Sequence, residues 1–149
     1  MDSTIYRQLI GSLIYLTNTR PDLCYVVNIL SRFMQEPQDS HWNAAKRVLR
    51  YIQGTKDFGI LYTKTKNFLL GGYFDADFAG SIDDRASTSG YLMNMGSAAV
   101  SWSCKKQVTV ATSLAEAEYI STWEATCVWL RRILQDLGIS QAEATSFIH

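Results

Sequence analysis

Two aspartates stand two positions apart in the segment Tyr73-Phe74-Asp75-Ala76-Asp77-Phe78. Alternation along a strand places Asp75 and Asp77 on one face and the intervening aromatic and small residues on the other. Carboxylates this close repel each other, so the pair needs solvent, protonation of one member, or a divalent cation between them. The spacing alone leaves these three alternatives open.

A second acidic group, Glu116 and Glu118, follows Ser113 in a segment of helical spacing. Ser113 and Glu116 have the spacing of a capping box, which gives Glu116 a structural role at the start of the helix. Glu118 instead falls on a stripe of small residues, where a carboxylate needs a partner. Acids in the first strand and in the first turns of the helix after three strands suit Mg²⁺, which prefers hard oxygen ligands held by rigid elements.

Basic side chains gather in two places along the chain. Lys46, Arg47 and Arg50 share one face of a predicted helix, where they either contact phosphates or form the solvated side of an amphipathic helix. Lys105 and Lys106 follow a predicted strand and either approach a substrate or belong to a solvated turn. The sequence leaves both pairs of alternatives open.

Composition excludes several other classes of function. With 14 basic and 14 acidic residues the net charge is zero, so any nucleic-acid partner must be recognised by local patches. The histidines, His41 and His149, lie in no motif of nucleophilic or metal-protease chemistry.

Cys24, Cys104 and Cys127 lack metal-ligand spacing and are expected to be small buried residues in a reducing compartment. Without a leader pattern or a long apolar run, we expect a soluble intracellular protein.

Apolar residues recur at helical spacing over residues 4–54 and predict three helices. The first ends near residues 17 and 18. Thr19 has the position of a cap for the second helix, with Asp22 reaching back to it. Asp39 or Ser40 is expected to cap the third helix, which ends at Gly54. The predicted buried face of the third helix carries Trp42, Ala45, Leu49 and Ile52.

After a predicted domain boundary near residue 55, the apolar period changes to alternation, through residues 58–62 and then 68–78. Two further strands, 87–95 and 98–104, are joined by a hairpin in which Gly96 supplies the positive φ. Helical spacing returns over residues 113–137 and ends at Gly138, and residues 145–148 begin another strand. The prediction is an α/β chain of the α+β kind, with an antiparallel three-stranded meander, a long helix and the start of a fourth strand.

Together these segments resemble the copia-type retrotransposon polyprotein, in the region that spans the end of reverse transcriptase and the ribonuclease H domain. The resemblance covers essentially the whole chain. It rests on Gly11-Ser12-Leu13-Ile14-Tyr15-Leu16, Thr19-Arg20-Pro21-Asp22, residues 41–51 (HWNAAKRVLRY), residues 83–91 (DDRASTSGY) and Ser101-Trp102-Ser103-Cys104-Lys105-Lys106-Gln107.

The resemblance implies two domains: residues 1–54 as the helical C-terminal region of reverse transcriptase, thumb- or connection-like, and residues 55–149 as a truncated ribonuclease H-like domain. It assigns the first metal-binding aspartate to Asp75, with Asp77 as the weaker candidate, and the second glutamate of the family's Glu-Ala-Glu-Tyr motif to Glu118. The expected cofactor is a pair of Mg²⁺ ions, with Mn²⁺ as an alternative, and the expected reaction is hydrolysis of the RNA strand of an RNA–DNA hybrid.

One departure from the family concerns the third acidic ligand, an aspartate at the end of the strand that follows the long helix. The present chain ends at Ile148-His149, at or just before that position, so we expect little or no activity from these residues alone. The alternative is a non-catalytic nucleic-acid-binding or structural remnant. The expected partners are an RNA–DNA hybrid and the rest of the polyprotein, without a membrane, in a cytoplasmic virus-like particle or the nucleus.

Overall fold

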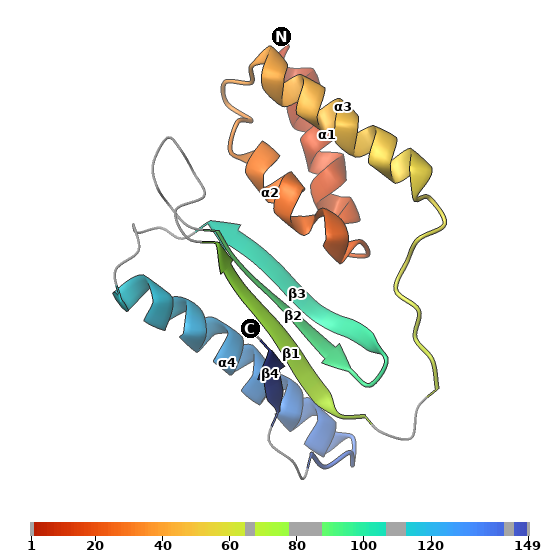
Figure 1. Cartoon of the computed structure of the whole chain (residues 1–149), viewed down its shortest axis with the longest axis vertical. Coiled ribbons are helices and arrows are strands. Elements are labelled where there is room, and N and C mark those ends of the chain that lie inside the picture. The colour runs from red at the N-terminus through yellow and green to blue at the C-terminus, as the bar shows by residue number, and fades with distance from the viewer. Residues whose placement is uncertain (1, 65–67, 78–87, 107–112, 142–144, 149) are drawn as a thin grey trace. The chain divides into compact units, whose positions relative to one another are not determined.

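A computed structural model of the chain describes residues 2–64, 68–77, 88–106, 113–141 and 145–148 (Figure 1). The chain divides into two compact units, Met1–Ile60 and Leu61–His149. The first is helical and the second combines a sheet with a helix, so the chain is of the mixed α/β class that the sequence predicts.

The first unit contains α1 (Ser3–Leu16), the short 3₁₀ helix η1 (Pro21–Leu23), α2 (Cys24–Ser31) and α3 (Asp39–Gly54). Asp2 caps α1, because its side chain accepts a hydrogen bond of 2.8 Å from the backbone N–H of Thr4. The three predicted helices are therefore confirmed, with η1 inserted before the second.

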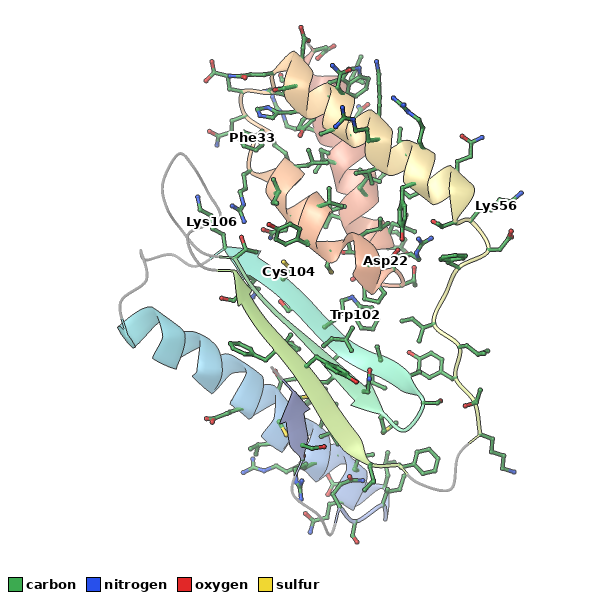
Figure 2. The ribbon with its side chains drawn as sticks, viewed as in Figure 1. Asp22, Phe33, Lys56, Trp102, Cys104 and Lys106 are labelled. Atoms are coloured by element: carbon green, nitrogen blue, oxygen red, sulfur yellow. The ribbon has the colours of Figure 1, made fainter. Side chains whose placement is uncertain are left out.

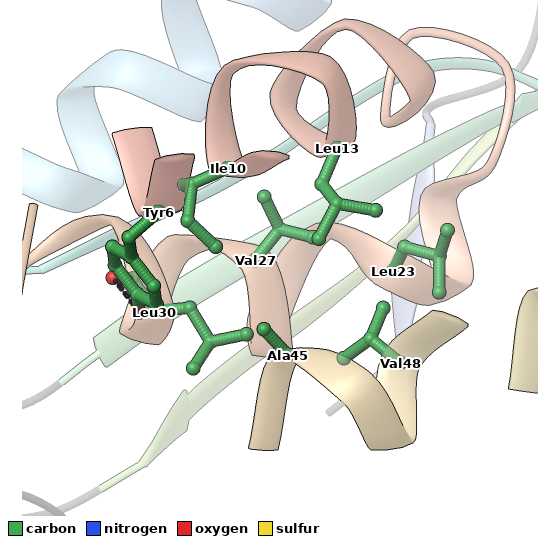
Figure 3. Close-up of a cluster of buried hydrophobic side chains, with 8 residues drawn as sticks. All are labelled: Tyr6, Ile10, Leu13, Leu23, Val27, Leu30, Ala45 and Val48. Atoms are coloured by element: carbon green, nitrogen blue, oxygen red, sulfur yellow. Dashed lines mark hydrogen bonds between the residues drawn. The ribbon is translucent and has the colours of Figure 1, made fainter. Parts of the chain in front are cut away.

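Buried side chains from α1, η1, α2 and α3 form the core of this unit (Figure 3). The Tyr6 hydroxyl, a polar group among these side chains, donates a 2.9 Å hydrogen bond to the backbone oxygen of Leu30. Burial of the Tyr6 ring raises the pKa of its phenol, so the hydroxyl remains a donor. The core consists of Tyr6, Ile10, Leu13, Leu23, Val27, Leu30, Ala45 and Val48.

The predicted buried face of α3 is wrong at one position. Leu49 is 42% exposed, whereas its neighbour Val48 is 5% exposed. The stripe that packs on α1 and α2 runs through Ala45, Val48 and Ile52, spaced by three and four residues. Leu49 therefore lies at the edge of the surface that α3 packs on α1 and α2.

The predicted caps of the second and third helices are also wrong. Thr19 donates its hydroxyl to the backbone oxygen of Leu16, and Asp22 does not bond back to it. At the start of α3 the cap is Gln38, one residue earlier than expected. Its backbone N–H donates to Nδ1 of His41 at 3.1 Å, which completes a capping box in which histidine takes the usual place of glutamate.

The second unit contains β1 (Leu70–Asp77), β2 (Thr88–Met95), β3 (Ala98–Lys106), α4 (Ser113–Asp136) and β4 (Ser146–Ile148). The sheet order is β3-β2-β1-β4, with antiparallel pairing among the first three and β4 parallel to β1. The predicted meander, long helix and fourth strand are confirmed. Gly96 (φ 62°) in the hairpin adopts the positive φ expected of it, and Gly138 (φ 77°), where the long helix was expected to end, also has a positive φ.

The alternating residues 58–62 form no strand. The last residue of this segment and the residue after it are instead joined to the β2–β3 hairpin by hydrogen bonds that involve side chains. The Tyr62 hydroxyl donates to the backbone oxygen of Ala99 at 2.8 Å, and the Thr63 N–H donates to the Ser97 hydroxyl at 3.1 Å. Alternation of apolar residues was therefore an insufficient signal in this segment.

Helix α4 lies along one face of the sheet (Figure 1). Leu70 of β1, Met93 of β2 and Cys127 of α4 form the buried cluster between them. Among the described helices, none is long and apolar enough to cross a membrane.

Candidate metal site and basic surfaces

Asp75 and Asp77 belong to the last three residues of β1. In the antiparallel register Asp75 is opposite Gly90 and Asp77 is opposite Thr88, both on β2. The backbone thus places the two aspartates at the C-terminal end of an internal strand of the sheet. Their side chains lie outside the described part of the structure.

Glu118 lies in the second turn of α4, which begins at Ser113. The C-terminal end of β1 and the N-terminal end of α4 are at the same end of the sheet (Figure 1). The topology therefore brings the elements that carry Asp75, Asp77 and Glu118 to one end of this unit. A shared metal site among these three residues stays a prediction, as does the capping role of Glu116, whose side chain is likewise outside the described part.

Strand alternation decides which layer each acid belongs to. Positions 75 and 77 are on the same face of β1 as Tyr73, which is 49% exposed. Leu70 is on the opposite face of β1 and packs on α4. Glu118 is on α4, so a site common to β1 and α4 must lie around the end of the sheet, where both layers are reachable.

Strand β4 runs beside β1 toward this same end. Its register pairs Gly71 with Ser146 and Tyr73 with Ile148, so the parallel strand advances in the direction of Asp75. Parallel neighbours bring their C-terminal ends to one edge of a sheet, where ligand sites of open α/β sheets gather. The fourth strand is thus placed to flank the candidate site.

The start of β4 is held by a hydrogen-bond network that the sequence did not reveal. Arg131 of α4 donates from Nη1 to the Thr145 hydroxyl at 2.9 Å and from Nη2 to the backbone oxygen of Gln141 at 2.8 Å. The Gln141 amide accepts from the backbone N–H of Leu70 at 3.0 Å and donates to the backbone oxygen of Phe68 at 2.6 Å. Two side chains therefore tie α4, the chain before β4 and the start of β1 together.

Lys105 and Lys106 lie within β3, which extends two residues beyond its predicted end. Lys105 is opposite Ser89 of β2, and Lys106 is opposite Thr88. The expectation that these lysines follow the strand is therefore wrong, and a solvated turn is excluded for both. The structure places them at the end of the sheet that carries Asp75 and Asp77.

Lys46, Arg47 and Arg50 are exposed on α3, on the side away from the buried Ala45 and Val48. The Lys46 ammonium lies 5.4 Å from the centroid of the Trp42 ring, within range of a cation–π contact. All three basic residues belong to the first unit, whereas the acids belong to the second. A basic helix face is thus present, and phosphate binding by it stays a prediction.

Arg20 is the buried charge that sequence reasoning missed. It is 6% exposed and donates to the Thr55 backbone oxygen at 3.0 Å and to the Thr55 hydroxyl at 2.8 Å, as well as to Asp22. The Tyr51 hydroxyl donates to Asp22 at 2.9 Å. Hydrogen bonding from Arg20 lowers the pKa of Asp22, and the same bond raises the pKa of Arg20. The sequence signal for this buried charge is the motif Thr19-Arg20-Pro21-Asp22, in which an arginine stands two residues before an aspartate.

Among the side chains that the structure describes, no three His, Cys, Asp or Glu groups gather as a metal site. A pocket of about 250 Å³ opens beside Arg20 and Asp22, with Tyr51 and Phe58 among its lining residues. Arg20, Asp22 and Tyr51 in its wall already bond to one another. We therefore assign these residues a structural role in the first unit and no catalytic role.

Comparison with known proteins gives clear sequence relatives. No protein-family profile matches the chain, and no solved structure matches it. The chain is 49% identical over 93% of its length to the retrovirus-related Pol polyprotein from transposon RE2 of Arabidopsis thaliana, of which it covers 10%. It is 43% identical over 93% of its length to the corresponding polyprotein from transposon TNT 1-94 of Nicotiana tabacum, again covering 10%. It is also 47% identical over 87% of its length to secreted RxLR effector protein 161 of Plasmopara viticola, of which it covers 94%.

Proposed function

The chain belongs to the family of Pol polyproteins from copia-type retrotransposons, and on this premise we propose that its second unit is part of a ribonuclease H domain. That domain would hydrolyse the RNA strand of RNA–DNA hybrids during reverse transcription. The first unit would be the C-terminal region of the adjoining reverse transcriptase. The partners would be the hybrid and the rest of the polyprotein.

The observation that carries this proposal is that the C-terminal end of β1 and the N-terminal end of α4 lie at the same end of the sheet (Figure 1). Asp75 and Asp77 are in the last three residues of β1, and Glu118 is in the second turn of α4. The sheet order β3-β2-β1-β4 puts β1 inside the sheet, which gives the aspartates a rigid support. Rigid support matters because a ligand set acts only when its oxygens are held at fixed separations.

Asp75 and Glu118 supply carboxylate oxygens, which are the ligands that Mg²⁺ and Mn²⁺ prefer. When bound, a pair of such ions activates a water and stabilises the leaving oxygen of a phosphodiester. Asp77 is the alternative ligand on β1. Two carboxylates alone leave two cations under-coordinated, so we expect metal binding to be a stronger readout than cleavage for the polypeptide of residues 1–149.

Metal binding can be tested with Mn²⁺, followed by electron paramagnetic resonance, on the unsubstituted chain and on Asp75→Asn and Glu118→Gln. We expect each substitution to weaken Mn²⁺ binding about tenfold or more. Asp57→Asn, which removes an exposed carboxylate of the first unit, is the matched control and should leave binding unchanged. Equal binding by all four proteins would overturn the assignment of Asp75 and Glu118.

Cleavage is tested with an end-labelled RNA–DNA hybrid in Mg²⁺, with the same four proteins. We expect slight cleavage of the RNA strand, absent from Asp75→Asn and Glu118→Gln. Robust cleavage that survives both substitutions would contradict the proposed site. Robust cleavage that either substitution abolishes would support the site and contradict the expectation of low activity.

A second candidate function is non-catalytic binding of nucleic acid through α3. The observation that favours it is the exposure of Lys46, Arg47 and Arg50 on one side of this helix. Phosphate contacts release counterions, so binding should weaken as salt rises. Arg47→Gln should weaken hybrid binding, whereas Arg7→Gln, at an exposed site on α1, should not. Binding that is insensitive to salt would contradict this reading.

A further inference from the structure

Strand β3 ends in two consecutive lysines, and strand alternation sends them to different layers of the second unit. Figure 2 shows Trp102, Cys104 and Lys106 following one another along β3. These three residues are two positions apart, so they share one face of the sheet, and Lys105 belongs to the other. The neighbouring lysines therefore have different surroundings.

The face of Lys106 is also the face of the candidate aspartates. Across the three antiparallel strands, one register row contains Asp77, Thr88 and Lys106, and the next row toward the sheet centre contains Asp75, Gly90 and Cys104. Directly paired residues of neighbouring strands share a face. Positions 75, 77 and 106 are thus on one face, at the same end of the sheet.

The face of Lys105 is the face on which α4 packs. Its register row contains Ala76 and Ser89, and the same face farther along carries Met93, which is buried against Cys127 of α4. Lys105 is exposed at the end of that layer, and Lys106 is half-buried. The two residues form an internal comparison, because they have the same charge at adjacent positions.

Distance makes Lys106 a neighbour of the candidate metal site and not a member of it. It is separated from β1 by one intervening strand, so its backbone lies roughly 10 Å from that of Asp77. A lysine carries its ammonium on a flexible four-carbon stem and binds phosphate as a point charge. It can therefore meet a phosphate group beside one that is held at the end of β1.

We propose that Lys106 binds a backbone phosphate of the nucleic-acid strand next to the phosphodiester held at Asp75 and Glu118, and that Lys105 does not. The inference rests on the proposed function, and it makes Lys106 a positioning residue for the substrate. The Thr88 position lies between the two charges in the row, and Gly90 in the next row adds no side chain that would fill the space beside Asp75.

The test measures binding of a fluorescein-labelled RNA–DNA hybrid by anisotropy in Mg²⁺, over a series of salt concentrations. We expect Lys106→Gln to raise Kd about tenfold and to lower the slope of log Kd against log salt by about one phosphate contact. Lys106→Arg keeps the positive charge and should bind within about twofold of the unsubstituted chain. Lys105→Gln, the matched control, should do the same.

Three results would overturn the inference: equal weakening by Lys105→Gln and Lys106→Gln, no effect of Lys106→Gln, or no hybrid binding by the unsubstituted chain. Far-UV circular dichroism of each variant shows whether the fold is retained, and Lys106→Arg provides a folded comparison if Lys106→Gln unfolds. Mn²⁺ binding separates this inference from the proposed function. If Lys106→Gln leaves hybrid binding unchanged while Asp75→Asn still weakens Mn²⁺ binding, only the role of Lys106 is contradicted. If Asp75→Asn leaves Mn²⁺ binding unchanged, the metal site itself is contradicted.

Discussion

Arg20 and Asp22 form a two-point ion pair, with Nε donating to Oδ1 at 3.0 Å and Nη2 donating to Oδ2 at 2.8 Å. The guanidinium is buried and the carboxylate is partly exposed. Because Arg20 also bonds to Thr55 and Asp22 also bonds to Tyr51, the pair joins the start of the second helix to the end of α3. The junction between these helices therefore depends on a planar group that donates in several directions at once.

Replacing Arg20 should cost more than its single charge suggests. Arg20→Lys keeps the charge but loses the planar guanidinium that bonds to Asp22 and Thr55 at once. We expect the free energy of unfolding to fall by about 1–2 kcal/mol. Arg20→Ala should cost about 2–3 kcal/mol, because it also leaves the Thr55 carbonyl without this donor. Urea unfolding followed by far-UV circular dichroism measures both. Arg50→Ala, at an exposed site on the same unit, should change stability by less than about 0.5 kcal/mol. An Arg20→Lys variant as stable as the unsubstituted chain would contradict the need for a guanidinium at this position.

The same ion pair predicts how stability depends on pH. The bond from Arg20 lowers the pKa of Asp22 in the folded chain, so folding favours the ionised carboxylate. The resulting stabilisation is complete above the ordinary aspartate pKa of about 3.9 and is lost as pH falls through the lower folded value. The stability difference between the unsubstituted chain and Asp22→Asn should therefore shrink at acidic pH. A difference that widens on acidification would contradict the predicted sign.

Local signals in the sequence predicted much of the fold. The three-helix piece, the meander and the long helix followed from the period of apolar residues, which depends on neighbours a few positions away. The positive φ of Gly96 and the end of the long helix at Gly138 were predictable, because both depend on the conformational freedom of a single glycine. The element order then placed Asp75 on β1 and Glu118 on α4 without any knowledge of contacts.

What the sequence could not predict depends on partners distant along the chain. Asp22 has the spacing of a capping residue, yet it bonds to Tyr51, 29 positions away. The hydrogen bonds of Arg131 and Gln141 join segments more than 60 residues apart, and no local sequence pattern predicts them. The end of β3 extends to Lys106 because β2 continues beside it, which is a property of the pairing and not of the lysines.

The burial of α3 gives a direct test at two adjacent positions. Val48→Ala removes two buried methyl groups and should lower the free energy of unfolding by about 2 kcal/mol. Leu49→Ala removes a larger amount of side chain, but from a site that is 42% exposed, so it should cost less than about 1 kcal/mol. Urea unfolding of both variants provides the comparison. A larger loss for Leu49→Ala would restore the buried face that the sequence suggested.

The attachment of β4 to β1 should depend on Arg131 and not on its neighbour Arg132. Arg131→Ala removes the donors to Thr145 and to Gln141, and charged hydrogen bonds of this kind contribute about 1.5–3 kcal/mol each at most. We therefore expect hydrogen exchange, followed by mass spectrometry, to speed up in β4 and in the part of β1 that pairs with it, while exchange in β2 and β3 stays slow. Arg132→Ala removes an exposed side chain of the same type and should leave all four strands protected. Because β4 is the strand that runs toward Asp75, faster exchange confined to β4 and its partner would show that α4 holds this flank of the candidate site through one guanidinium. Unchanged exchange in Arg131→Ala would mean that backbone pairing alone is sufficient.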